Sequence, residues 1–113
     1  MNFKTNKVID MSFMFNECSN LINLDVSNFN TENVINMKGM FQLCSNLKIL
    51  DIKNFKTNKV TDMSFMFYGC SNLKNLDVSN FNTENVKFNK NMLPYNSNNF
   101  INDCILIYFF IFY

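Results

Sequence analysis

The sequence predicts an α/β repeat fold: a solenoid of about three full rungs and a decayed fourth, with short parallel strands on one face and short helices on the other. Three observations predict it: a period of 26 residues, an alternation of apolar residues in one part of each repeat, and apolar spacings of three and four in another. Residues 3–34 and 55–86 differ at only four of 32 positions. Repeats this similar stack so that each buries its apolar face against its neighbours.

The strand is predicted near the end of each repeat. In the third repeat the chain alternates through Leu76, Asp77, Val78 and Ser79. Because successive side chains of a strand point to opposite faces, Leu76 and Val78 are expected inside and Asp77 and Ser79 outside. One such strand in each rung gives a parallel sheet.

The helix is predicted upstream of the strand. Apolar residues there recur at intervals of three and four, the spacing of one helical face: Val60, Met63, Met66, Phe67 and Cys70. Asp62 precedes this segment and can cap its first amides. Gly69, Ser71 and Asn72 then provide turn residues before the strand.

Equivalent residues are expected to form columns through the stack. We expect Phe29, Phe55 and Phe81 to stack as an aromatic spine, and Asn28, Asn54 and Asn80 to form a ladder that satisfies loop amides. A third column holds Cys18, Cys44 and Cys70. Neighbouring Cα atoms ~4.8 Å apart lie within disulfide range, yet three cysteines cannot all pair. Buried thiols are therefore favoured over a disulfide or a metal role.

Composition argues against catalysis and nucleic-acid binding. The chain has no histidine and no arginine, which removes the commonest general base and the bidentate anion-binding side chain. The net charge is +1 and the charges are interspersed, so no basic stripe indicates a nucleic-acid partner. We predict a protein that is not an enzyme and that has no cofactor and no metal.

The phrase VTDMSFMFYGCSNLKNLDVSNFNTENV at residues 60–86, with its copies, resembles the repeat of the BspA-like leucine-rich-repeat surface proteins. The resemblance covers roughly residues 1–88. It implies a leucine-rich-repeat-type solenoid that is secreted or displayed on a cell surface and binds or adheres to host or cell-surface proteins, with no catalytic residues. The sequence shows no signal peptide, so this location is implied by the resemblance alone.

The repeat pattern predicts two regions, the solenoid at residues 1–88 and a degenerate terminal repeat with an apolar tail at residues 89–113. The segment Cys104–Tyr113 is almost wholly apolar. As a helix it would span ~15 Å, about half of a hydrocarbon core, so no transmembrane helix is expected.

We predict a protein-interaction or adhesion module that binds a protein partner through its exposed strand face. The candidate contact residues are the outward positions of the three strands: Asn23, Asp25, Ser27, Ile49, Asp51, Lys53, Asn75, Asp77 and Ser79. The Asp25–Asp51–Asp77 column could bridge a Ca²⁺ ion, but a structural role for these carboxylates is favoured. The alternative function is a truncated structural remnant of a longer repeat protein, without independent activity.

Overall fold

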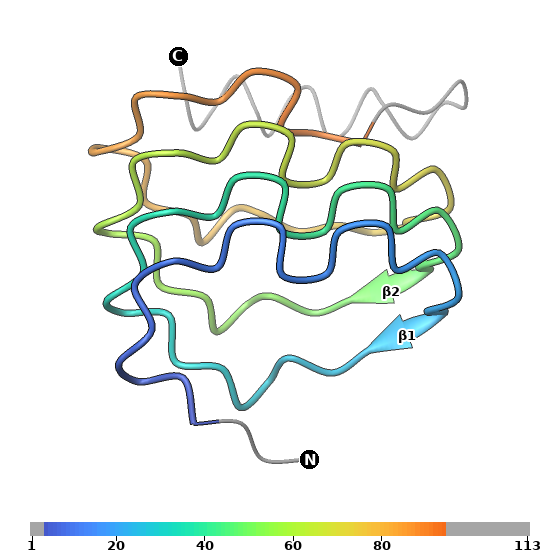
Figure 1. Cartoon of the computed structure of the whole chain (residues 1–113), viewed down its shortest axis with the longest axis horizontal. Coiled ribbons are helices and arrows are strands. Elements are labelled where there is room, and N and C mark those ends of the chain that lie inside the picture. Colours follow the sequence, from blue (N-terminus) through green and yellow to red (C-terminus); the bar gives the residue numbers. More distant parts are fainter. Residues whose placement is uncertain (1–3, 95–113) are drawn as a thin grey trace.

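The computed structural model describes residues 4–94, and in it the chain completes one coil per repeat. Parallel bridges join Asp10 to Asn36, Asn36 to Asp62 and Asp62 to Phe88. Each bridge joins equivalent positions of successive repeats, so the coils lie directly on one another (Figure 1). We call residues 4–28, 29–54 and 55–80 the first, second and third rungs; residues 81–94 begin a fourth.

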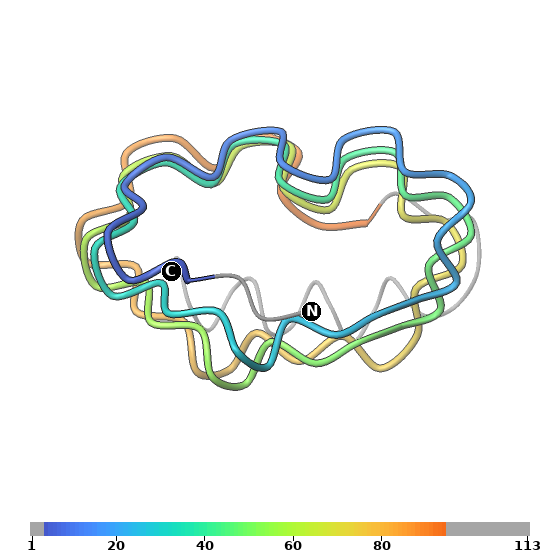
Figure 2. The same ribbon diagram turned by 60° about the horizontal axis from the view of Figure 1, so that its bottom comes forward.

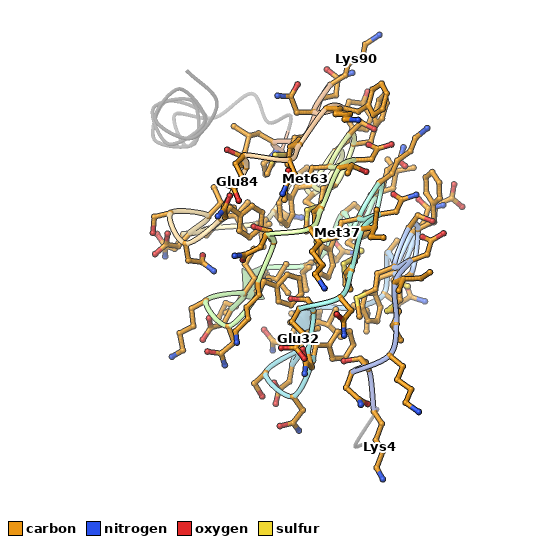
Figure 3. The ribbon with its side chains drawn as sticks, turned by 90° about the vertical axis from the view of Figure 1, so that its left-hand side faces the viewer. Lys4, Glu32, Met37, Met63, Glu84 and Lys90 are labelled. Carbon is orange, nitrogen blue, oxygen red and sulfur yellow. The ribbon has the colours of Figure 1, made fainter. Side chains whose placement is uncertain are left out.

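Seen nearly along the stack, the rungs superpose as a flattened ring (Figure 2). One long side, which we call the ladder wall, contains residues 9–17 and their equivalents. The opposite side, the strand face, contains residues 22–27, 48–53 and 74–79. The core lies between these sides: Met37 and Met63, both 0% exposed, point into it, whereas Glu32 and Glu84 lie on the corner loops (Figure 3).

The strand face holds two short strands, β1 (Asn23–Leu24) and β2 (Ile49–Leu50), which pair in parallel with Asn23 opposite Ile49. The predicted alternation is confirmed in the third rung, where Leu76 and Val78 are buried and Asp77 and Ser79 exposed. The predicted strand itself is absent from that rung, because Asn75 has a φ of 56° in the left-handed region and leaves the extended conformation.

The predicted α/β solenoid with helices on one face is wrong: residues 4–94 contain no helix. On the ladder wall, alternate amides donate to the next rung and not to their own segment. The bonds run from Met11 to Asn36, Phe13 to Lys38, Phe15 to Met40 and Glu17 to Gln42, at 2.8–2.9 Å between amide nitrogen and carbonyl oxygen. The second and third rungs repeat this pattern, so the wall is a backbone ladder between rungs.

Consecutive turns explain why the spacing suggested a helix. The amides of Met14, Asn16 and Cys18 each bond to the carbonyl three residues earlier, which marks a chain of four-residue turns. Such turns return the chain to the same side every three or four residues, as a helix does. A helix cannot run through them, because Phe13 and Glu17 have φ values of 57° and 61°.

Asp62 does not cap a helix as predicted. Its carboxylate accepts a hydrogen bond from the Ser64 amide at 2.9 Å, and Asp10 accepts one from Ser12 at 2.8 Å. An acidic or amide side chain bonded to the backbone two residues on forms an Asx turn. The aspartates therefore shape the entry to the ladder wall.

The aromatic spine consists of different residues from those predicted. The rings that stack nearly parallel are Phe15, Phe41 and Phe67, with centroids 5.6 and 5.7 Å apart. Phe29 and Phe55 contact this stack from the side, at 6.1 Å from Phe15 and 6.4 Å from Phe41 respectively. Phe29 and Phe55 of the predicted column therefore pack against the spine. The spine itself comes from the segment that the sequence predicted to be a helix.

A column of buried threonines joins the rungs at one corner. The Thr31 hydroxyl donates to the Lys56 carbonyl at 2.9 Å and accepts from the Lys56 amide at 2.8 Å. Thr5 and Thr57 make the same pair of bonds to Asn30 and Asn82. Each hydroxyl thus satisfies both backbone groups of one residue in the next rung.

The predicted asparagine ladder is confirmed at Asn80, whose amide group donates to the Ile52, Lys53 and Phe55 carbonyls at 3.0–3.3 Å. Residues 88–92 stack on the third rung, and Met92 is 1% exposed. The apolar tail Cys104–Tyr113 lies outside the described residues. Across residues 4–94, no helix has the length and apolar character needed to cross a membrane.

We expect Thr31→Val to lower the free energy of unfolding by about 1–3 kcal/mol, because the Lys56 amide and carbonyl lose their partner. Thr31→Ser, which keeps the hydroxyl, serves as the control. Urea denaturation followed by circular dichroism measures the difference. Equal stability of wild type and Thr31→Val would contradict the role of this column.

Gly69→Ala is expected to destabilise the fold by about 1 kcal/mol or more, through the cost of a left-handed alanine and through crowding. The φ of Gly69 is 78°, and a Cβ there would lie 3.2 Å from the Leu43 Cα and 2.5 Å from its Cδ2. Glu17→Ala is the matched control, since Glu17 occupies the same column at a φ of 61° and already carries a Cβ. Thermal denaturation compares the stability loss in the two variants. A loss as large in Glu17→Ala as in Gly69→Ala would rule out crowding by the new Cβ as the cause.

Candidate functional site

All nine residues predicted to contact a partner are exposed on the strand face. Between them lie the buried Val26, Ile52 and Val78, which fix the chain to the core. The exposed side chains therefore form rows across the three rungs, on a backbone held from beneath.

Asx turns set the orientation of the three strand-face aspartates. Asp25, Asp51 and Asp77 accept hydrogen bonds from the amides two residues on, at 2.9, 3.0 and 2.9 Å. The Ser79 hydroxyl also donates to Asp77 at 2.5 Å. Hydrogen bonds from the serine hydroxyl and then from its amide lower the pKa of Asp25, through Ser27, and of Asp77, through Ser79. These two carboxylates are stabilised in the charged form.

One oxygen of each aspartate is thus already used within its own loop. The described residues include no group of three or more side chains of the kinds that hold a metal ion. The structural role preferred for the Asp25–Asp51–Asp77 column is supported by these turns, which follow β1 in the first rung and β2 in the second and recur in the third.

The structure brings part of the predicted face together around a cleft of about 310 Å³ between the second and third rungs. Residues 49–53 line one side, and Lys74, Asn75 and Asp77 line the other. Five predicted contact residues are among its lining: Ile49, Asp51, Lys53, Asn75 and Asp77. The other four do not line it: Asn23, Asp25, Ser27 and Ser79.

Sequence reasoning missed Lys74 as a site residue. A signal was available, because Ile22/Lys74 is one of the four differences between residues 3–34 and 55–86. Lys74 is exposed at the edge of the cleft. The buried Leu50 and Ile52 supply an apolar floor that alternation predicted as core.

The cleft opens where the two rungs stop pairing. The Lys74 amide donates to the Lys48 carbonyl at 3.0 Å. Beyond Lys74, Asn75 turns into the left-handed region, and within the described chain no backbone bond joins residues 49–55 to residues 75–80. The Asn80 side chain reconnects the rungs through the carbonyls of residues 52, 53 and 55.

Both signs of charge surround the cleft. Lys53 and Asp51 form an ion pair at 3.6 Å, with side chains 76% and 62% exposed. An exposed pair of this kind adds little stability, so it is available to rearrange around a ligand. Lys48 and Lys74 occupy the same column of neighbouring rungs, and of the two only Lys74 lines the cleft.

The cysteine column holds free thiols, of which Cys44 and Cys70 are buried and Cys18 is half-buried. The sulfur of Cys44 donates to the Phe15 carbonyl and that of Cys70 to the Phe41 carbonyl, both at 3.0 Å. Burial raises the pKa of Cys44 to about 11 and that of Cys70 to about 12. These two thiols are neutral at pH 7, and their hydrogen bonds join neighbouring rungs as those of the threonines do. The sequence favoured such buried thiols over a disulfide, and the thiols are free.

We expect Cys70 and Cys44 to resist iodoacetamide at pH 8 in the folded protein and to react after unfolding in urea, with mass spectrometry locating the label. Because the folded pKa lies above the ordinary 9.0, burial of the neutral thiols favours folding below pH 9. Stability should therefore fall as pH rises from 9 through 11 and 12. Rapid labelling of Cys44 or Cys70 in the folded protein at pH 8 would contradict this assignment.

A family model matches the chain. Its description is "Mycoplasma protein of unknown function, DUF285", and the match spans residues 1–105. No curated protein and no solved structure matches the chain. The match includes every rung described above and most of the sequence, and the chain therefore belongs to the DUF285 family of Mycoplasma proteins of unknown function.

Proposed function

We propose that this chain is a non-enzymatic protein-interaction module of a leucine-rich-repeat type of cell-surface protein and that it binds a protein partner through the strand face. The observation that carries the proposal is the cleft between residues 49–53 and the third rung. It combines an apolar floor with a charged edge, the composition typical of a binding site.

The strand face exposes two of the large apolar side chains of the described residues, whereas most of the exposed ones lie on the ladder wall. Ile49 is 66% exposed, the highest value among the large apolar side chains of the described residues, and Ile22 in the rung beside it is 53% exposed. Exposed apolar residues that cluster with charged ones are typical of protein-binding surfaces.

The side chains available for chemistry support a binding role over catalysis. The sequence has no histidine to act as a general base near neutral pH. Cys44 and Cys70 are buried with raised pKa values, which makes them poor nucleophiles. The strand-face aspartates accept hydrogen bonds within their own turns.

Site-specific photo-crosslinking tests the proposed face. A benzophenone amino acid replaces Ile49, in the cleft, and in a matched variant it replaces Ile35, which is 44% exposed on the ladder wall. Each variant is irradiated with detergent-solubilised cell-surface proteins. We expect a discrete adduct from position 49 and none from position 35.

Charge variants show whether the adduct reflects binding at the cleft. Lys53→Glu should reduce the adduct about two- to fivefold, because a charge at the edge of an interface contributes a modest share of binding energy. Asp51→Asn removes a charge but keeps the turn, as Asn36 does with the Lys38 amide at 2.9 Å. A partner that is captured equally from positions 49 and 35, and that ignores both charge changes, would move the binding site off the strand face.

A further inference from the structure

We propose that the ladder wall is a self-association surface, on which two copies of this chain pack wall against wall with their stacks running in opposite directions. This surface lies on the side of the molecule opposite the strand face, so the inference goes beyond the proposed function and does not depend on it. The second copy is related to the first by a two-fold axis that lies between the two walls and runs parallel to the rungs.

Most of the exposed apolar side chains of the described residues lie on the ladder wall. Phe88 in the fourth rung is 61% exposed and Ile9 in the first is 58% exposed. Phe13, Ile35 and Leu43 of the same wall are 45%, 44% and 37% exposed. The Ile35 amide bonds to the Ile9 carbonyl at 2.7 Å, so these two isoleucines are neighbours. Neighbouring exposed apolar residues are typical of protein interaction sites.

The charged residues of the wall change sign along the stack, in which the rungs lie side by side (Figure 1). From the first rung to the fourth they are Asp10 and Glu17, Lys38, Asp62, and Lys87 and Lys90. The formal charges of the four rungs on this wall are therefore −2, +1, −1 and +2. Within residues 4–94 none of these six side chains forms an ion pair. All six charges are available to groups outside the chain.

This order of charges selects the orientation of the second copy. Reversing the stack places the first rung against the fourth and the second against the third, so the formal charge is opposite at every contact. Asp10 then meets Lys87 and Lys90 of the second copy, and Lys38 meets Asp62. A parallel arrangement would place each rung against its own equivalent, with like charges together at both ends. Complementary charges across an interface fix its orientation and exclude the wrong one.

The same axis places each column of residues against its own column. Asp10 and Phe88 occupy one column in the first and fourth rungs, as the series of parallel bridges between them shows. Ile9 and Lys87 occupy the column beside it. Ile9 of one copy therefore meets Phe88 of the other, so the two most exposed large apolar side chains of the wall cover each other. The aliphatic stem of Lys87 adds apolar cover while its charge stays at the rim.

Sedimentation equilibrium of the full chain, over a range of about 10 μM to 1 mM, tests the proposal. We expect a monomer–dimer equilibrium that shifts toward the monomer when the salt concentration is raised from about 20 mM to about 500 mM, because salt screens exposed charges. A wild type that remains a monomer throughout this range would overturn the proposal.

A charge variant of the first rung tests the orientation. Asp10→Asn with Ser12→Lys gives this rung the Asn-Met-Lys sequence of the second rung. The turn is kept, because Asn36 accepts a hydrogen bond from the Lys38 amide at 2.9 Å in the second rung. The variant places a positive charge against the basic fourth rung of the second copy, and it should weaken the dimer about tenfold at low salt.

A second variant, Lys87→Glu with Lys90→Glu, changes the opposite end of the wall and should weaken the dimer by a similar factor. A one-to-one mixture of the two variants should restore a dimer, because the changed rung of each then meets an opposite charge on the other. Lys48→Glu with Lys56→Glu makes the same change of net charge away from the wall and should leave the dimer as strong as in the wild type. Failure of the mixture to associate would overturn the antiparallel arrangement.

Ile9→Thr tests the apolar contact and copies Thr61, the equivalent residue of the third rung. It should weaken the dimer about three- to tenfold, because apolar area that Phe88 covers is lost in both halves of the interface. Ile22→Thr is the matched control, since Ile22 is 53% exposed on the strand face, and it should have no effect. Circular dichroism establishes that each variant is folded. A dimer that is insensitive to every wall variant would assign association to another surface and overturn the proposal.

The dimer and the strand-face function fail separately. A benzophenone adduct from position 35 that contains two copies of this chain reports the dimer, and its mass distinguishes it from an adduct with a cell-surface protein. If the wild type is a monomer and position 49 still captures a partner, the dimer is wrong and the proposed function stands. If the dimer forms and position 49 captures nothing, only the proposed function is lost.

Discussion

Alternate amides of the ladder wall donate to carbonyls of the following rung, and the rest of the architecture depends on this arrangement. The Phe13 amide, for example, reaches the Lys38 carbonyl at 2.8 Å, and the Gly39 amide reaches the Ser64 carbonyl at 2.9 Å. A buried backbone must satisfy its polar groups, and a wall without helices can do so only through its neighbours. The distance between rungs is thus fixed at strand spacing, which brings equivalent side chains into contact.

Side-chain columns supply hydrogen bonds where the backbone ladder does not. The Thr31 hydroxyl serves both backbone groups of Lys56, and the Cys70 thiol serves the Phe41 carbonyl. Asn72 and Asn46 donate to carbonyls of the preceding rungs at 2.8 and 2.6 Å. These bonds explain why the repeat keeps threonine, cysteine and asparagine at fixed places among its apolar residues. A small polar group in such a position links two rungs and leaves little buried polarity unsatisfied.

The candidate site is the place where this regularity ends. Backbone pairing between the second and third rungs reaches Lys74 and then stops, and Asn80 restores the connection through its side chain. Between these points lies the cleft, with the exposed Ile49 and the charges of Asp51, Lys53 and Lys74 around it.

The sequence alone determined the period, the columns and the exposure of the strand face. Equivalent positions recur every 26 residues, and alternation through Leu76 and Val78 separates inside from outside whatever the detailed conformation. Only the tertiary structure showed that the ladder wall is made of turns, because apolar spacings of three and four residues occur both in helices and in consecutive turns. Only the tertiary structure showed the cleft, because Asn23 and Asn75 lie in nearly identical sequences and yet one is extended and the other left-handed. Asparagine adopts the left-handed conformation more readily than most residues, so its identity at both positions does not predict which rung is extended.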